Sequence, residues 1–278
     1  MSPLQLVFEE ILPDDTETFE EFYTVFAELF PFDDEREPRA AFWQVVGFNR
    51  DPDIQSRFGP WREVVAAVRL GPGGPVVGGH VFGATTSQAH IDFGCKASIQ
   101  GIYLFLAPKH RGSSAFISAA RDYAERLALS TFGYEKDPKK PPLIFLEVNN
   151  PLHMTEEQIF SDTKMSGLSP YKRYNKYKRL KCRPLDFKYV QLPLGPKANA
   201  VSYLDLFCSA DWATGIPSEL IFTHLRAFTS ISILKGNPAE DHPAFAAMQK
   251  ALVPGKVINF ICERDLEQER IRNGPPTR

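Results

Sequence analysis

Apolar residues follow two different spacings along the first half of the chain. Between residues 16 and 29 the large apolar side chains stand three or four positions apart, behind an acidic start that can cap a helix. Residues 62–70 and 76–84 are rich in β-branched and apolar residues and flank a Gly-Pro-Gly-Gly-Pro turn, which predicts a hairpin. The same criteria predict strands over 4–12, 100–106 and 143–148 and helices over 39–47 and 113–129.

The second half repeats this alternation after a long stretch that resembles an insertion, 152–168. Its expected elements are strands over 187–192, 201–207 and 257–262, helices over 218–228 and 243–252, and an apolar run over 231–234. Residues 193–199 are the best candidate for a boundary, so we expect one domain over 1–195 and a C-terminal α/β extension over 196–278. The apolar runs of the extension predict that it packs on the first domain, although a dimerisation element fits them as well.

Composition is that of an ordinary globular protein. Hydrophobic residues make up 43% and charged residues 24% of the 278 residues, which is enough for a buried core. The net charge of −2 gives no general attraction to nucleic acid or to an anionic membrane. The four cysteines stand far apart, without the close pairs of zinc or redox motifs, and no histidine spacing indicates a metal site. We therefore expect reduced thiols and no bound metal.

Hydropathy argues against a membrane protein. No apolar run reaches the roughly 18 residues that a membrane-spanning helix needs. The first residues combine a short apolar run with acidic residues and lack the basic start of a signal peptide. These observations predict a cytoplasmic protein.

One turn carries recognisable chemistry. The expected strand over 100–106 runs into Ala107-Pro108-Lys109-His110-Arg111-Gly112 and then into a helix. Together with the order of the elements around it, this turn resembles the V-x-P-x-x-R-G turn of the GNAT superfamily of acyl-CoA-dependent N-acyltransferases. The resemblance covers about residues 4–192. It implies an α/β fold with a mixed, largely antiparallel central sheet flanked by helices, here followed by the C-terminal extension.

The resemblance also implies a place for an acyl-CoA co-substrate. Free backbone N–H groups at the start of a helix bind a pyrophosphate, and the strand before the turn can bond to the amides of pantetheine as an added strand would. The residues expected to bind the cofactor in this way are Leu104, Leu106, Arg111, Gly112, Ser113, Ser114 and Ala115. Ser114 and Phe116 depart from the small residues of the family pattern, and an ordinary strand-to-helix turn is the alternative.

Two further positions match residues of the family, Tyr177 and Asn150. Tyr177 occupies the tyrosine of the pattern Y-x-[KR]-L-G-F, which implies protonation of the departing CoA thiolate, although Lys181 and Cys182 replace its Gly-Phe. Tyr171 and Tyr174 are rivals at helical spacing, and amphipathic packing is the alternative for all three. Asn150 falls where the family has an asparagine that touches the cofactor arm. Glu147 is the candidate base, directly or through water, and a structural hydrogen-bond partner is the alternative for it.

Taken together, these residues predict transfer of an acyl group, with acetyl as the first candidate, from acyl-CoA to a small-molecule amine. One alternative is a longer acyl chain, delivered on CoA or on an acyl carrier protein. The basic residues between 172 and 183 suit that carrier or the 3′-phosphate of CoA, while a solvated helix face is their simpler explanation. Another is a GNAT-like binding module without catalysis. A homodimer is left open.

Overall fold

The computed structural model describes residues 6–31, 36–111, 114–194 and 199–261. Their centre is a seven-stranded sheet in the order β1-β2-β3-β4-β5-β7-β6. The strands are β1 (Leu6–Glu10), β2 (Trp61–Leu70), β3 (Val76–Thr85), β4 (Ser98–Leu106), β5 (Leu143–Asn149), β6 (Cys182–Pro184) and β7 (Leu204–Ser209). All neighbouring pairs are antiparallel except β4 and β5. The mixed, largely antiparallel sheet predicted from the sequence is confirmed.

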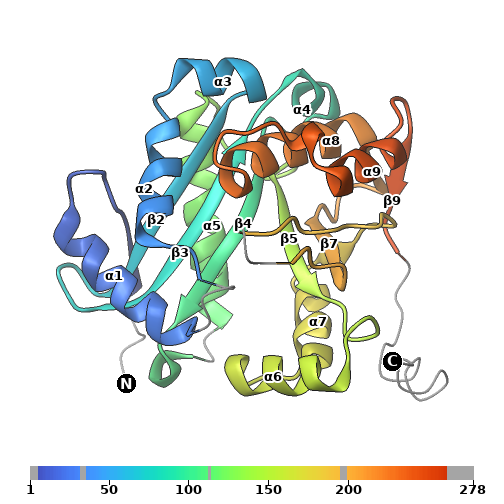
Figure 1. Cartoon of the computed structure of the whole chain (residues 1–278). Coiled ribbons are helices and arrows are strands. Elements are labelled where there is room, and N and C mark those ends of the chain that lie inside the picture. Colours follow the sequence, from blue (N-terminus) through green and yellow to red (C-terminus); the bar gives the residue numbers. More distant parts are fainter. Residues whose placement is uncertain (1–5, 32–35, 112–113, 195–198, 262–278) are drawn as a thin grey trace.

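Helices cover both faces of this sheet (Figure 1). One face carries α1 (Thr16–Leu29), α2 (Arg39–Phe48), α3 (Pro52–Phe58) and α8 (Ser218–Phe228). The other face carries α5 (Ser114–Thr131) and α7 (Pro170–Arg179). The remaining helices are α4 (Gln88–Phe93), α6 (Glu156–Ser166) and α9 (Pro243–Ala251). Among the described residues, no helix is both long and apolar enough to cross a bilayer.

Helices α3 and α6 lie where no helix was predicted from the sequence. Asp51 caps α3 with its side chain and Pro52 stands at the first helical position, a combination typical of helix starts. Thr155 and Gln158 form a reciprocal capping box at the start of α6, inside the stretch interpreted as an insertion. Both signals are present in the sequence, but the helices are short and weakly amphipathic.

The predicted strand over 187–192 is wrong. Leu185, Phe187 and Tyr189 are buried while the residues between them are more exposed, so the chain has the alternation of a strand. These side chains nevertheless pack on the cluster around α8 and α9. Among the described residues, the segment pairs only through isolated bridges, from Leu185 to Phe260 and from Gln191 to Val201. An extended segment that packs on helices thus shows the same alternation of buried and exposed residues as a strand in a hydrogen-bonded sheet.

The strand expected over 201–207 belongs to the main sheet. It is β7, which inserts between β5 and β6, with Phe145 opposite Cys208. The sheet therefore continues past the predicted division at residues 195 and 196. Beyond it, β8 (Gly215–Pro217) pairs with β9 (Val257–Asn259) in a separate two-stranded sheet.

Helix α8 packs on the sheet through its apolar side. Its buried residues include Leu220, Ile221, Leu225 and Phe228. Phe228 lies 6.0 Å from the ring of Trp61 on β2. The helix continues as a π-helical turn, Thr229–Ile233, which contains the apolar run predicted around residue 231.

This turn covers a buried carboxyl group on β2. Glu63 accepts hydrogen bonds from Ser232 Oγ at 2.7 Å and from Trp61 Nε1 at 3.0 Å. Burial raises the pKa of Glu63 to about 7 in spite of these bonds, because the charged form loses its hydration. The folded state therefore favours the protonated carboxyl.

We predict that Glu63→Gln stabilises the protein more at high pH than at low pH. The pKa of Glu63 is higher in the folded state than in the unfolded state. Its contribution to the free energy of unfolding is therefore fully present below pH 4.5 and is lost as the pH rises through about 7. The loss amounts to about 2 to 3 kcal/mol. Urea unfolding of both proteins at pH 5 and pH 8 measures it. An advantage of the variant that is equal at both pH values, or larger at pH 5, would contradict the assignment.

Candidate active site

Strands β4 and β5 pair along only part of their lengths. Their parallel register runs from Ser98 opposite Leu143 to Gly101 opposite Leu146 and then stops. Beyond it β4 continues to Leu106 and β5 to Asn149 as the two strands diverge (Figure 1). Among the described residues, no strand pairs with the facing edges of these ends, and we call the gap between the two strands the wedge.

A β-bulge in β4 lies at the apex of this wedge. Against β3, Phe82 pairs with Gly101 and Val81 pairs with Tyr103, so Ile102 is the extra residue. A bulge bends its strand and reverses the faces of the residues that follow. As a result Tyr103 packs beside α1, whereas Leu106 contacts Phe116 of α5.

Glu147 lies on β5 at the wedge and faces the α8 side of the sheet. It is one residue beyond the last β4–β5 pair and is half-buried. One carboxylate oxygen accepts a short hydrogen bond from the hydroxyl of Tyr189, a residue of the segment that was predicted as a strand. Burial raises the pKa of Glu147 to about 7, and the bond from Tyr189 opposes this shift. A carboxyl group in this state can accept a proton near neutral pH.

Tyr177 lies on the opposite face from Glu147. It packs with Leu146, Val148 and Phe207, and its ring is 6.3 Å from that of Phe207. Its hydroxyl makes no hydrogen bond with the described residues. Burial raises the pKa of Tyr177, so the phenol stays protonated throughout the neutral range.

The structure separates Tyr177 from its rival Tyr174. The hydroxyl of Tyr174 donates to Asp205 on β7 at 2.6 Å, and the side chain is fully buried. Asn150 Nδ2 donates to the same carboxylate at 2.9 Å, while Asn150 Oδ1 accepts from the backbone of Leu152. The side chains of Tyr174 and Asn150 thus hold α7 and the end of β5 to β7.

Lys181, near the end of the tyrosine pattern, has an unusual backbone conformation. The backbone of Lys181 has a φ of 63°, which lies in the left-handed region that favours glycine. Glycine is the residue that the Y-x-[KR]-L-G-F pattern carries there. Cys182 then begins β6.

The expected phosphate turn is described only in part. Gly112 and Ser113 lie outside the described residues, as does the side chain of Ser114, which begins α5. Arg111 donates to the carbonyl of Leu106 at 3.1 Å and to the carbonyl of Ser166 at 3.2 Å, joining the end of β4 to the end of α6. Ala115 is exposed on the first turn of α5.

The two expected leucines lie on the α5 side of β4. Leu106 is buried, whereas Leu104 is 41% exposed, which is unusual for a leucine in an internal strand. Leu104 thus exposes an apolar side chain on this part of β4, while the unpaired edge of the strand presents backbone N–H and C=O groups.

A buried hydrogen-bond chain ends at the same apex and was not anticipated from the sequence. His224 of α8 lies 2.8 Å from Ser98 Oγ and 3.0 Å from the amide oxygen of Gln100. His90 of α4 contacts the same serine at 2.7 Å. Burial lowers the pKa of both histidines, so both are neutral. The chain fixes α4 and α8 to β4 immediately before Gly101.

Nothing in the described part of the chain gathers three histidine, cysteine or acidic side chains into a metal-binding group. Cys95, Cys182 and Cys208 are free and buried. The described residues beside the wedge include the carboxyl group of Glu147 and the phenols of Tyr189 and Tyr177.

No family model matches the chain, and no curated protein sequence matches it. Among solved structures it is similar to a tandem GNAT protein from the clavulanic acid biosynthesis pathway, with 16% identity and a TM-score of 0.40, over 67% of this chain and 46% of that one. It is also similar to AtaTR bound with AcCoA, with 13% identity and a TM-score of 0.32, over 73% and 93% of the two chains. The chain thus spans less than half of the tandem protein.

Proposed function

We propose that the protein is an acyltransferase that moves an acyl group, with acetyl as the first candidate, from acyl-CoA to a small-molecule amine. The observation that carries the proposal is Glu147. It is a half-buried carboxyl group with a pKa of about 7 at the point where two central strands separate. Attack on a thioester requires a neutral amine, and a base of this pKa can remove the proton near neutral pH.

The open wedge suits the pantetheine arm of CoA. A chain of amides can bond to the free edge of β4 between Ile102 and Leu106 as an added strand would. Leu104 would line its apolar part. We place the pyrophosphate at the backbone of Arg111 to Ala115, where the start of α5 offers N–H groups and the positive end of the helix dipole. The thioester would then lie at the apex of the wedge.

The two candidate catalytic residues lie on opposite faces of the sheet, Glu147 on β5 itself and Tyr177 packed against Leu146 and Val148 of β5. In the proposed reaction the amine nitrogen attacks the thioester carbon, and its proton passes to Glu147 directly or through water. Backbone N–H groups of β4 at the apex, near Ile102, would stabilise the oxyanion of the tetrahedral intermediate. The C–S bond then breaks, and Tyr177 protonates the thiolate. Positioning of the two substrates would supply much of the rate.

Tyr177→Phe should lower turnover by about 10²-fold or more and leave CoA affinity unchanged, because only the proton donor is removed. Steady-state kinetics with acetyl-CoA and a calorimetric titration with CoA measure the two quantities. Tyr174→Phe is the matched control, since its hydroxyl bonds to Asp205 and should contribute to stability instead. Equal turnover of wild type and Tyr177→Phe would exclude Tyr177 as the acid.

Thermal-shift measurements test the function and separate its alternatives. Acetyl-CoA and free CoA should both raise the melting temperature, because a ligand that binds only the folded state stabilises it. A larger shift with long-chain acyl-CoA would favour the longer acyl donor. If none of them shifts the melting temperature, a GNAT-like module without CoA binding is the better description.

A further inference from the structure

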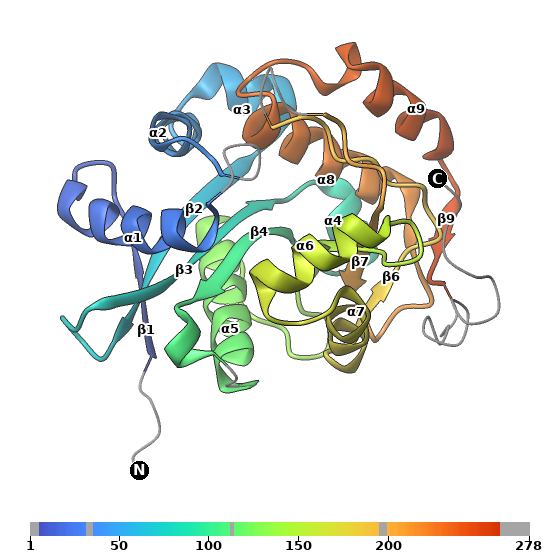
Figure 2. The same ribbon diagram turned by 60° about the horizontal axis from the view of Figure 1, so that its bottom comes forward.

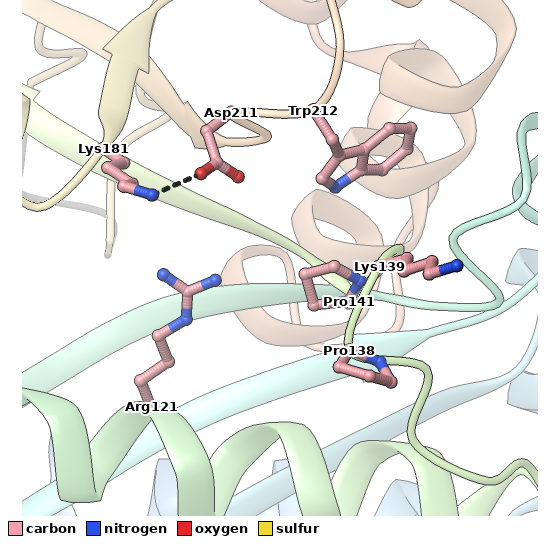
Figure 3. A pocket seen from close by; sticks show the side chains of 7 residues that line it. All are labelled: Arg121, Pro138, Lys139, Pro141, Lys181, Asp211 and Trp212. Atoms are coloured by element: carbon pink, nitrogen blue, oxygen red, sulfur yellow. Dashed lines mark hydrogen bonds and ion pairs between the residues drawn. The ribbon is translucent and has the colours of Figure 1, made fainter.

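A basic cavity lies away from the wedge, between α5, the loop that leads to β5, and the outer end of β6 (Figure 3). Its volume is about 380 Å³, and its lining carries three positive charges and one negative charge. The charged residues are Arg121, Lys139, Lys181 and Asp211. They come from four separate segments of the chain, so it is the fold that brings these charges together.

Two of the three cationic side chains, Arg121 and Lys181, lie on one side of the cavity, while the Lys139 side chain extends away from them (Figure 3). Arg121 bonds to Glu125 at 2.7 Å through Nε alone, and its two terminal nitrogens point toward the cavity. Lys181 reaches across to Asp211, with Nζ 2.8 Å from the carboxylate. An anion with several oxygens could therefore contact both side chains at once.

Lys181 occupies its place at a conformational cost. Its φ of 63° lies in the left-handed region, where a residue with a side chain is less favourable than glycine. Glycine at this position would avoid that cost, so the fold keeps a lysine side chain beside the cavity in spite of the backbone.

Trp212 supplies a donor that nothing in the described chain satisfies. Its indole Nε1 is buried and has no hydrogen-bond partner among the described residues. The nitrogen lies on the edge of the ring that faces Pro141 across the cavity (Figure 3). A buried N–H without a partner is costly, and an acceptor atom of a ligand in the cavity would remove that cost. Pro138 and Pro141 make the opposite wall rigid and apolar.

We propose that this cavity binds a phosphate group, either free or as the monoester of a small organic molecule. A tetrahedral oxyanion would accept hydrogen bonds from Arg121, Lys181 and Trp212 Nε1, and the organic part of a monoester would lie against the two prolines. The site differs from the proposed pyrophosphate turn, because Arg121 stands about 10 Å along α5 from Ser114 at 1.5 Å per residue. It does not depend on the proposed acyl transfer.

Fluorescence of Trp212 tests the proposal. Inorganic phosphate and AMP should each give a saturable change that sodium chloride at matched ionic strength does not give, and Trp212→Phe should abolish the change. Tighter binding of AMP than of phosphate would indicate an organic monoester, and equal binding would indicate the free ion. Adenosine should give no saturable change, since it lacks the phosphate.

Lys181→Gly should weaken binding about tenfold or more, through loss of one charge-assisted contact. The substitution removes a strained side chain and so leaves the backbone able to fold. Lys96→Gly is the matched control, because Lys96 has the same φ of 63° and lies outside the cavity. The proposal is overturned if neither phosphate nor AMP saturates, if adenosine binds as AMP does, or if Lys181→Gly keeps the affinity of wild type.

Discussion

Glu147→Gln should lower kcat with acetyl-CoA and an amine acceptor by about 10² to 10⁴-fold, the usual contribution of a general base. The amide fills nearly the same volume and can still accept a hydrogen bond from Tyr189, so the protein should fold and bind CoA normally. For the wild type, the rate should rise with pH up to about 7 and then level off, because the carboxylate is the active form. The pH–rate profile of the variant should lack this limb.

Glu63→Gln is a matched control for this experiment. Glu63 is also a strand carboxyl group with a pKa raised to about 7, but it lies under the π-helical turn and not at the wedge. Replacing Glu63 should change how the free energy of unfolding depends on pH. It should leave kcat unchanged, together with the rise of the rate with pH up to about 7. If Glu147→Gln keeps both kcat and the limb, Glu147 is not the base.

Phe207→Ala should destabilise the protein by about 3 to 5 kcal/mol, the range for a large cavity in a core. Phe207 has an exposed fraction of 0% on β7 and packs edge-on against Tyr174, with ring centroids 4.7 Å apart. The substitution would open a cavity between the sheet and α7, beneath Tyr177. Chemical denaturation followed by circular dichroism gives the free energy of unfolding.

Phe160→Ala serves as the control for the same change of residue. Phe160 is 73% exposed on α6, so its loss should alter the free energy of unfolding by less than about 0.5 kcal/mol. Equal effects of the two substitutions would contradict the placement of β7 inside the sheet.

The local elements of the first domain could be predicted because their signals are local. The apolar period of α1, the turn between β2 and β3, and the strand–turn–helix around Pro108 each lie within a short stretch of sequence. The fold class follows from their order.

Long-range contacts explain what the sequence could not indicate. Tyr189 meets Glu147 across 42 residues, and His224 meets Ser98 across 126. Neither pair has a spacing that marks it. Sequence spacing also fails to distinguish Tyr174 from Tyr177, because both lie on α7 three residues apart. Only the packing against β7 shows that the first is bonded to Asp205 while the hydroxyl of the second is not.

The alternation in residues 185–192 shows a further limit. A strand and an extended segment packed on helices both bury every second residue, so hydropathy alone cannot distinguish them. What differs is the hydrogen-bond partner, and that is set by β7 taking the place beside β5.

A crystal structure of the protein with acetyl-CoA tests the central claim most directly. We expect the pantetheine arm in the wedge between Leu104 on β4 and Glu147 on β5, with the pyrophosphate at the first turn of α5 and the thioester at the apex. Acetyl-CoA bound elsewhere on the molecule, or a wedge that stays empty at saturating acetyl-CoA, would contradict the proposed acyltransferase.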